Sequence, residues 1–307
     1  MSDSIKHECG IALLRLLKPL SFYQEKYGSP LYGLNKMYLL MQKQVNRGQD
    51  GAGIVNIKLN TAPGIPYISR RRSVDANPIQ DLFSKISQNF TQIKKSYPEQ
   101  FNNPEWLKSH CSFTGELSLG HLRYGTYGGN SIAHCHPFLR QNNWQTRNLV
   151  LAGNFNMTNV EELLQQLIDL GQHPKERSDT VTILEKIGHF IDEENSRIYH
   201  LHKNQNLTNV QISKKIGDEL DVSNILKNAS KKWDGGYVLS GMIGHGDAFA
   251  LRDPSGIRPA FYFQNDEVVV VTSERPVIQT AFNVSSDDIH ELPRGTAIII
   301  KSNGNVS

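Results

Sequence analysis

A cysteine that leads into an apolar run lies close to the beginning of the chain. The segment Cys9-Gly10-Ile11-Ala12-Leu13-Leu14 follows an eight-residue leader. If the leader were removed, Cys9 would carry both a thiol and a free α-amino group, so a nucleophile and a base would share one residue. An α-amino group titrates near ~8 and a free cysteine near ~8.5, so the amine can accept a proton close to neutrality. The segment predicts either an N-terminal nucleophile or a buried cysteine at the start of a strand.

The leader and the cysteine count indicate the compartment. Asp3 and Glu8 make the leader acidic and no apolar stretch precedes Cys9, which excludes a lipid-modified secretory cysteine. The three cysteines, Cys9, Cys111 and Cys135, cannot all pair within one chain. An odd count without a signal peptide is typical of a reducing compartment, so we expect a cytoplasmic protein.

Composition excludes two classes of partner. The 307 residues suffice for one large domain or two small ones, and the formal charge is only +3. The most basic run, Arg70-Arg71-Arg72, is short and predicts a solvated loop or strand edge, so we expect no nucleic-acid partner. No segment approaches the ~18 uninterrupted apolar residues of a membrane helix, so we expect no membrane partner.

His134-Cys135-His136 is the one segment that suggests metal ligation. Adjacent residues on a strand point to opposite faces, so only the two histidines could converge on one ion. No second cluster of Cys and His stands at zinc spacing. We therefore expect no metal site and no cofactor in this part of the chain.

The order of the elements predicts the fold class. Apolar residues at helical spacing predict a helix over 34–45, before a glycine-rich loop and a strand over 54–57. Residues 60–118 are expected to form a surface excursion with a polar helix over 81–95. Further helices are predicted near 160–168, 178–191 and 222–232, and strands fill most of the last third. Strands at both ends with helices between them predict a layered α+β domain with largely antiparallel sheets.

Six motifs, in order along the chain, resemble the class II glutamine amidotransferase family. The resemblance is to N-terminal nucleophile hydrolases, and in particular to the glutaminase half of the amidophosphoribosyltransferases. Gln49 after Arg47-Gly48 is similar to the phosphoribosyl members of the family. The motifs are Cys9-Gly10-Ile11, Arg47-Gly48-Gln49-Asp50-Gly51-Ala52-Gly53, Gly120-His121-Leu122-Arg123-Tyr124-Gly125-Thr126, Asn154-Phe155-Asn156-Met157-Thr158-Asn159, Ser178-Asp179-Thr180 and Asp253-Pro254-Ser255-Gly256-Ile257-Arg258-Pro259.

The resemblance implies a four-layer αββα sandwich of two mainly antiparallel sheets. It implies a propeptide over 1–8 and an amidotransferase domain over 9–307 that hydrolyses L-glutamine. The ammonia would serve phosphoribosylamine synthesis from phosphoribosyl pyrophosphate, the first step of purine biosynthesis. No acceptor motif is found in the chain, so the partner would be a phosphoribosyltransferase domain or chain. A magnesium–phosphoribosyl pyrophosphate site is expected only in that acceptor domain, and a homo-oligomer is compatible with the resemblance.

The resemblance also assigns roles to individual residues. Cys9 would attack the amide, and the Asn154 side chain and the Phe155 N–H would form the oxyanion hole. Arg123 would bind the α-carboxylate as a bidentate partner, and Asp179 the α-ammonium group. Thr126 would supply a further hydrogen bond and Arg47 would brace Cys9, whereas His121 is expected to be structural.

The oxyanion segment departs from the family pattern, which is His-Asn-Gly-Asn. Gly153 stands in the histidine position and Phe155 in the glycine position. A backbone donor survives a change of side chain, but a position that needs a positive φ would strain phenylalanine. Two alternatives therefore remain beside the leading hypothesis. One is a class II amidotransferase serving another acceptor, and the other is a catalytically silent regulatory domain that binds glutamine.

Overall fold

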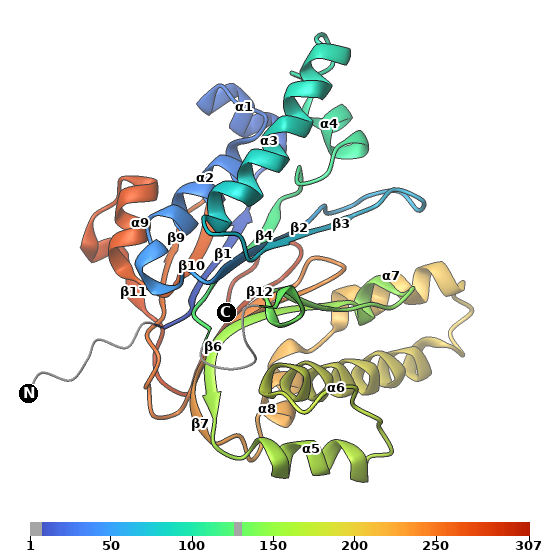
Figure 1. Ribbon diagram of the computed structural model, residues 1–307. Helices are drawn as coiled ribbons and strands as arrows, with labels where there is room; N and C mark the ends of the chain where they lie inside the picture. Colours follow the sequence, from blue (N-terminus) through green and yellow to red (C-terminus); the bar gives the residue numbers. More distant parts are fainter. Residues whose placement is uncertain (1–7, 126–130) are drawn as a thin grey trace, which may run out of the picture.

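The computed structural model describes residues 8–125 and 131–307. Two antiparallel sheets lie face to face, and helices cover the outer face of each sheet (Figure 1). The predicted four-layer αββα sandwich is confirmed by this arrangement. Among the described residues no helix has the length and apolarity needed to cross a membrane.

The first sheet has the strand order β11-β9-β10-β1-β4-β2-β3, and all neighbours pair antiparallel. Its central strand, β1, carries Cys9 just before its first residue, so the cysteine is held by the middle of the sheet. The strands are β1 (Gly10–Leu16), β2 (Gly51–Ile57), β3 (Ile68–Ser73), β4 (Leu117–Arg123), β9 (Phe261–Gln264), β10 (Val268–Thr272) and β11 (His290–Glu291).

The second sheet has the order β12-β8-β7-β6-β5, again with antiparallel neighbours. The strand β5 is short and pairs with only the first residues of β6, so the later part of β6 has no strand on that side. The strands are β5 (Phe138–Arg140), β6 (Leu149–Met157), β7 (Gly235–Ile243), β8 (Ala248–Arg252) and β12 (Ala297–Ile300).

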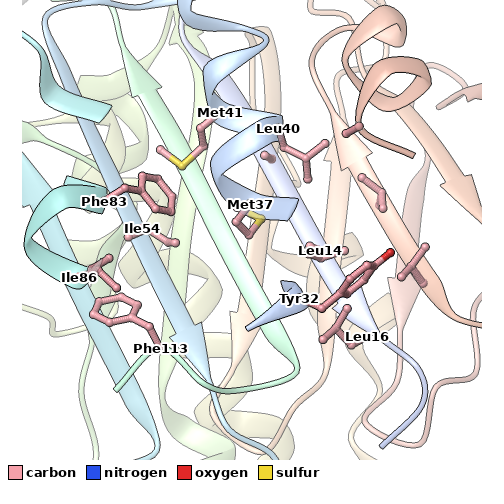
Figure 2. Packing of buried hydrophobic residues seen from close by; sticks show 14 of the residues in the cluster. Leu14, Leu16, Tyr32, Met37, Leu40, Met41, Ile54, Phe83, Ile86 and Phe113 are labelled. Carbon is pink, nitrogen blue, oxygen red and sulfur yellow. The ribbon is translucent and has the colours of Figure 1, made fainter. Parts of the chain in front are cut away.

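One helical layer covers the first sheet. Figure 2 shows Met37, Leu40 and Met41 of α2 above Leu14 of β1, with Phe83 and Ile86 of α3 beside Ile54 of β2. The helices of this layer are α1 (Leu20–Tyr27), α2 (Tyr32–Gln42), α3 (Pro78–Ser96), α4 (Pro104–His110) and α9 (Arg275–Phe282).

The other helical layer covers the second sheet, with α6 running across it (Figure 1). This layer consists of α5 (Val160–Asp169), α6 (Asp179–His202), α7 (Asn209–Glu219) and α8 (Val222–Ala229). Four single 3-10 turns are also described: Val45–Arg47, Ile132–His134, Gln145–Arg147 and Ser286–Asp288.

The strand β1 is buried on both faces. Leu14 and Leu16 face the helices, whereas Ile11 and Leu13 face the second sheet and pack in the same cluster as Val150 and other apolar residues of the inner faces. This explains why the segment is an unbroken apolar run rather than an alternating one, since both faces of the strand exclude water. The packing of β1 on β6 brings Cys9 close to the oxyanion segment.

Residues 60–118 differ from the sequence expectation. They contain β3, which pairs with β2, and α3, whose buried Leu82, Phe83 and Phe90 pack on the first sheet. The segment is therefore part of the core and not a surface excursion. The charged exposed face of α3 gives the segment a polar composition, but an amphipathic helix needs only one apolar stripe to pack on a sheet. The run Arg70-Arg71-Arg72 lies on the edge strand β3, as predicted.

Candidate functional site

Cys9 lies at the beginning of the central strand of the first sheet. Its Sγ accepts a hydrogen bond from the backbone N–H of Tyr124 at 3.4 Å. Burial raises the pKa of the Cys9 thiol, while the bond to Tyr124 and the charges of Arg123 and Arg47 oppose that rise. The sulfur is therefore a protonated thiol near neutrality in this form of the protein, and it needs a base before it can act as a nucleophile.

Glu8, the residue before Cys9, has its carboxylate bound inside the site. Oε2 accepts hydrogen bonds from Arg47 Nη2 at 2.8 Å and from Asn154 Nδ2 at 3.1 Å. Oε1 forms an ion pair with Arg258. Glu8, the last residue of the expected propeptide, thus accepts from the side-chain amide of Asn154, which is one of the two expected oxyanion donors.

Arg47 contacts both residues of the Glu8–Cys9 bond, through the carbonyl of Cys9 and the side-chain carboxylate of Glu8. Its Nε donates to the carbonyl of Cys9 at 3.2 Å, its Nη2 binds Glu8, and its Nη1 lies 3.4 Å from Oε1 of Glu274. These contacts are what a bracing residue requires. The role assigned to Arg47 stays a prediction.

Asn154 and Phe155 lie on β6, and the register of the sheet sets the direction of their backbone groups. Phe155 pairs with Tyr237 of β7, but the backbone N–H and C=O of Tyr237 both bond Asp253 on its other side. In an antiparallel ladder this makes Phe155–Tyr237 a pair without mutual hydrogen bonds. The Phe155 N–H therefore points away from β7, toward the side that β5 leaves uncovered, where no described residue accepts it.

The two departures from the family pattern, Gly153 and Phe155, are in contact with each other. A Cβ on Gly153 would lie 2.5 Å from Cδ1 of Phe155, so the phenyl ring fills the space next to the glycine. The φ of Phe155 is not positive and its backbone is that of a strand, so the strain considered from the sequence does not arise. The aromatic side chain has moved two residues along the same face of β6.

Arg123 is the last residue of β4 and is almost completely buried, with 5% of its surface exposed. A Cβ on Gly48 would lie 2.6 Å from the backbone carbon of Arg123, so only glycine permits this approach. Asp50 then accepts a hydrogen bond from the N–H of Gly125 at 2.8 Å, while its own N–H donates to the Arg123 carbonyl. The glycine-rich motif thus positions the end of β4 beneath Cys9.

Asp179 is the first residue of α6, and Ser178 caps the helix by accepting a hydrogen bond from the N–H of Val181 at 3.3 Å. Burial raises the pKa of the Asp179 carboxyl, although hydrogen bonds from Thr180 oppose the rise. A half-buried carboxylate at this place is suited to an ammonium partner, because burial strengthens the attraction between opposite charges. Thr126 lies outside the described residues.

A cleft of about 800 Å³ joins these elements. It contains Cys9, Asp179 and the two residues expected to form the oxyanion hole, whereas Arg123 and Arg47 are not among its lining residues. Its lining residues are Glu8, Cys9, Tyr124, Asn154, Phe155, Asn156, Met157, Val160, Glu161, Arg177, Ser178, Asp179 and Arg258.

Two residues of the site had no role assigned from the sequence. Arg258 belongs to the last motif, and its loop is held by Asp253, whose carboxylate accepts from the N–H groups of Ile257 and Arg258 at 3.0 and 3.2 Å. His136 was considered only as a metal ligand, yet its ring packs against Phe155 at a centroid distance of 5.6 Å. The sequence places Arg258 in a family motif, but only the fold shows that its guanidinium contacts the carboxylate of Glu8.

The segment His134-Cys135-His136 suggested metal ligation in the sequence. No group of three or more His, Cys, Asp or Glu side chains in the described part of the chain is arranged to hold an ion. Cys135, between the two candidate histidines, is buried and lies 3.4 Å from the carbonyl of Ala52.

Comparison with known proteins gives a consistent set of relatives. No family model matches the chain. The amidophosphoribosyltransferase of Pasteurella multocida is 25% identical over 84% of this chain and 42% of its own length. The enzyme of that name from Schizosaccharomyces pombe is 27% identical over 84% of this chain and 37% of its length, and that from Bacillus subtilis is 26% identical over 89% and 43%.

Solved structures show the same relationship at the level of the fold. The glutamine phosphoribosylpyrophosphate amidotransferase of Bacillus subtilis, in complex with ADP and GMP, superposes with a TM-score of 0.56 at 22% identity and covers 97% of this chain. This chain covers 49% of that structure, and it spans about two fifths of the length of the curated relatives it matches. The chain is therefore a homologue of the amidophosphoribosyltransferases with an N-terminal nucleophile hydrolase fold, which confirms the resemblance shown by the six ordered motifs.

Proposed function

We propose that this protein hydrolyses the side-chain amide of L-glutamine, with Cys9 as the nucleophile once residues 1–8 have been removed. The observation that supports this most is the placement of one carboxylate. Glu8 is joined to Cys9 and bonds Asn154 at 3.1 Å, so a carboxyl group next to the sulfur reaches the expected oxyanion donor. The carboxamide of glutamine has the same size and planarity as this carboxylate.

The reaction follows from the groups in the cleft. The freed α-amine of Cys9 takes the thiol proton, and the sulfur attacks the amide carbon. The oxyanion that forms is stabilised by the Asn154 side chain and the Phe155 N–H. The C–N bond then breaks as the α-ammonium returns its proton to the departing ammonia, which leaves a γ-glutamyl thioester. Water hydrolyses the thioester to glutamate and regenerates the thiol.

Substrate binding uses two opposite charges, one for each charged group on the α-carbon of glutamine. Asp179 pairs with the α-ammonium group of glutamine, and its position at the start of α6 keeps the carboxylate in place. Arg123 is assigned to the α-carboxylate, Arg47 to bracing Cys9 and Thr126 to a further hydrogen bond. No cofactor takes part in this half-reaction.

We infer that the ammonia acceptor is phosphoribosyl pyrophosphate, because the Bacillus subtilis structure is an amidotransferase for that substrate. The acceptor would bind, with magnesium, to a phosphoribosyltransferase domain or chain in contact with this one. Three free cysteines fit a cytoplasmic location.

Glutaminase turnover tests the hydrolytic proposal. Protein whose intact mass shows a chain beginning at Cys9 should release ammonia from glutamine, and Cys9→Ala should abolish the release. The matched control is Cys111→Ala, because this buried cysteine packs between the first sheet and its helices and does not line the cleft, so its loss should leave turnover unchanged. Wild-type turnover in Cys9→Ala would overturn the mechanism. A permanently retained leader with no turnover would instead support the silent glutamine-binding domain.

The acceptor is tested with amide-labelled ¹⁵N-glutamine in the presence of a phosphoribosyltransferase partner. Label in phosphoribosylamine, dependent on phosphoribosyl pyrophosphate, supports the assignment. Label that appears only as free ammonium would place the acceptor elsewhere.

A further inference from the structure

Two buried histidines replace the missing strand beside the oxyanion segment. The strand β5 pairs Phe138 with Leu151, and continuing this register would place residue 136 opposite Gly153. Instead of a backbone bond, the His136 Nδ1 accepts the N–H of Gly153 at 3.2 Å. The His121 Nε2 donates to the Gly153 carbonyl at 3.1 Å. Both backbone groups of the residue before Asn154 are therefore held by imidazoles.

The two rings form one buried unit. Their centroids are 4.3 Å apart, and 1% of His121 and 7% of His136 is exposed. We call His121 and His136 together the histidine pair. The β5–β6 ladder ends at the pair Phe138–Leu151, and the histidine pair bonds the backbone of Gly153 but reaches no further along β6. The N–H of Phe155, on the same side of β6, is left for a ligand.

The hydrogen bonds determine the tautomer of His136. A backbone N–H can only donate, so Nδ1 must carry the lone pair, and the ring proton of neutral His136 is on Nε2. Nε2 lies 3.1 Å from Oγ1 of Thr180 and donates to it. The Thr180 hydroxyl is then able to donate to Oδ1 of Asp179 at 3.3 Å, and the Thr180 N–H donates to the same oxygen at 2.7 Å.

These bonds form a continuous path from the oxyanion strand to the first residue of α6. It runs from Gly153 through His136 and Thr180 to Asp179, and each step has one direction of donation. Such a path sets the distance between the place where the amide oxygen gains charge and the place where the substrate ammonium binds. A displacement of about 1 Å in such a site can cost about 10²-fold in rate.

We propose that His136 is a positioning residue that holds the oxyanion strand and the ammonium-binding carboxylate in register, acting through Gly153 on one side and Thr180 on the other. The expected changes in kcat and KM rest on the proposed glutaminase function. The hydrogen bonds that His136 forms to Gly153 and Thr180 do not depend on that function. His136 touches no substrate atom in this role.

Three variants separate the two ends of this hydrogen-bonded path. The Gly153 arm is the bond from Gly153 to His136, and the Asp179 arm consists of the bonds from His136 through Thr180 to Asp179. Thr180→Val removes the hydroxyl with little change in shape, and should raise KM for glutamine about tenfold with kcat nearly unchanged, because only the Asp179 arm is lost. His136→Leu should raise KM similarly and also lower kcat by about 10²-fold, because the Asn154 segment is released as well. His136→Gln should restore most of both losses, since its Oε1 and Nε2 can accept and donate in the same directions.

The matched control is Phe138→Leu. Phe138 packs edge-on against His136 at 5.1 Å, so this change removes ring packing and keeps every hydrogen bond of the path. If His136 is merely a packed core side chain, His136→Leu and Phe138→Leu should both lower the folded fraction and leave kcat and KM per folded molecule unchanged. That result, or a failure of His136→Gln to recover activity while remaining folded, would overturn the proposal.

A spectroscopic test is independent of glutaminase activity. In wild-type protein, ¹⁵N imidazole resonances should show His136 with an unprotonated Nδ1 and a protonated Nε2, unchanged between about pH 5.5 and 8. A proton on Nδ1 or a charged ring would overturn the positioning path. Absence of turnover in wild-type protein with the expected tautomer would overturn the proposed function alone.

Discussion

The carboxylate of Glu8 accepts a hydrogen bond of 3.1 Å from the side-chain amide of Asn154. The residue that precedes the nucleophile thus occupies the group expected to stabilise the oxyanion. The same carboxylate is paired with Arg47 and Arg258, so its charge is compensated within the cleft. While Glu8 is attached, the α-amine of Cys9 is an amide nitrogen and its oxyanion donor is engaged.

Glu8 should exclude glutamate, the expected product, from the cleft. In Cys9→Ala protein whose intact mass shows that residues 1–8 are retained, Glu8→Ala should tighten L-glutamate binding about tenfold or more, because Arg47, Arg258 and Asn154 become available. Isothermal titration calorimetry measures the difference. The matched control is Glu161→Ala, an acid on the same cleft wall that pairs with Arg177 instead. Equal affinity with and without Glu8 would contradict its position in the site.

Gly153 and Phe155 should be coupled. Gly153→Ala places a Cβ 2.5 Å from the Phe155 ring and 2.9 Å from the backbone oxygen of Val238. The ring must turn and the strand must shift, which displaces the Phe155 N–H, so kcat should fall about tenfold. Phe155→Gly alone keeps the backbone donor and should change kcat much less. In the double variant the Cβ meets no ring and only the 2.9 Å contact with the Val238 oxygen remains, so part of the loss should be recovered. Strictly additive losses in the kinetic cycle would show that the two positions act separately.

Stability should fall in mild acid because of the histidine pair. Burial lowers the pKa of His121 to about 3 and holds the pKa of His136 well below its usual range. Below about pH 6.5 the unfolded chain binds protons that the folded chain refuses, so the free energy of unfolding decreases. Each imidazole should contribute a loss of about 2 kcal/mol between pH 7 and pH 5. Urea unfolding at both pH values measures it.

The control for this pH effect is His136→Gln, which does not titrate. Its stability should be about half as sensitive to pH as that of the wild type over the same interval, with His121 as the remaining source. His202 has the opposite effect on stability. Its hydrogen bond to Glu219 raises its pKa, so protonation of this ring in mild acid favours the folded state. An unchanged pH slope in His136→Gln would show that the buried imidazoles do not control acid sensitivity.

Gly53 should tolerate no side chain. A Cβ there would lie 2.0 Å from the carbonyl oxygen of His136, which is backbone and cannot rotate away. Gly53→Ala should therefore cost about 3 kcal/mol of unfolding free energy through overpacking. Gly217→Ala in α7 is the matched control, since its Cβ would make only a 3.4 Å contact with the His245 ring. Replacing a helical glycine should instead gain about 1 kcal/mol. Equal effects of the two changes would contradict the close packing at Gly53.

Helices with a strong apolar periodicity were predictable from the sequence, whereas helices with few apolar residues were not. The apolar spacing over 34–45 matches α2, and Ser178 caps α6 as its sequence indicated. The helix α7 was missed, because few of its residues are apolar and only Ile212, Ile216 and Gly217 are buried. The residues Thr158 to Glu161 match the sequence pattern of a capping box, but the N-cap residue of α5 is Asn159, and the Thr158 hydroxyl donates to Asp234. Local pattern cannot show a long-range partner that competes for a side chain.

The sequence by itself determined which family the chain resembles, through six motifs in the order of an amidotransferase, and it predicted the chemistry at Cys9. It could do so because reactive groups and the glycines that let backbones approach are properties of residue type and spacing. Tertiary structure alone decided which groups meet, since Glu8, Asn154 and Arg258 are separated by more than a hundred positions along the chain. Packing of one sheet on the other brings them within hydrogen-bonding distance, and it makes His136, which looked like a metal ligand, a partner of Gly153 and Thr180.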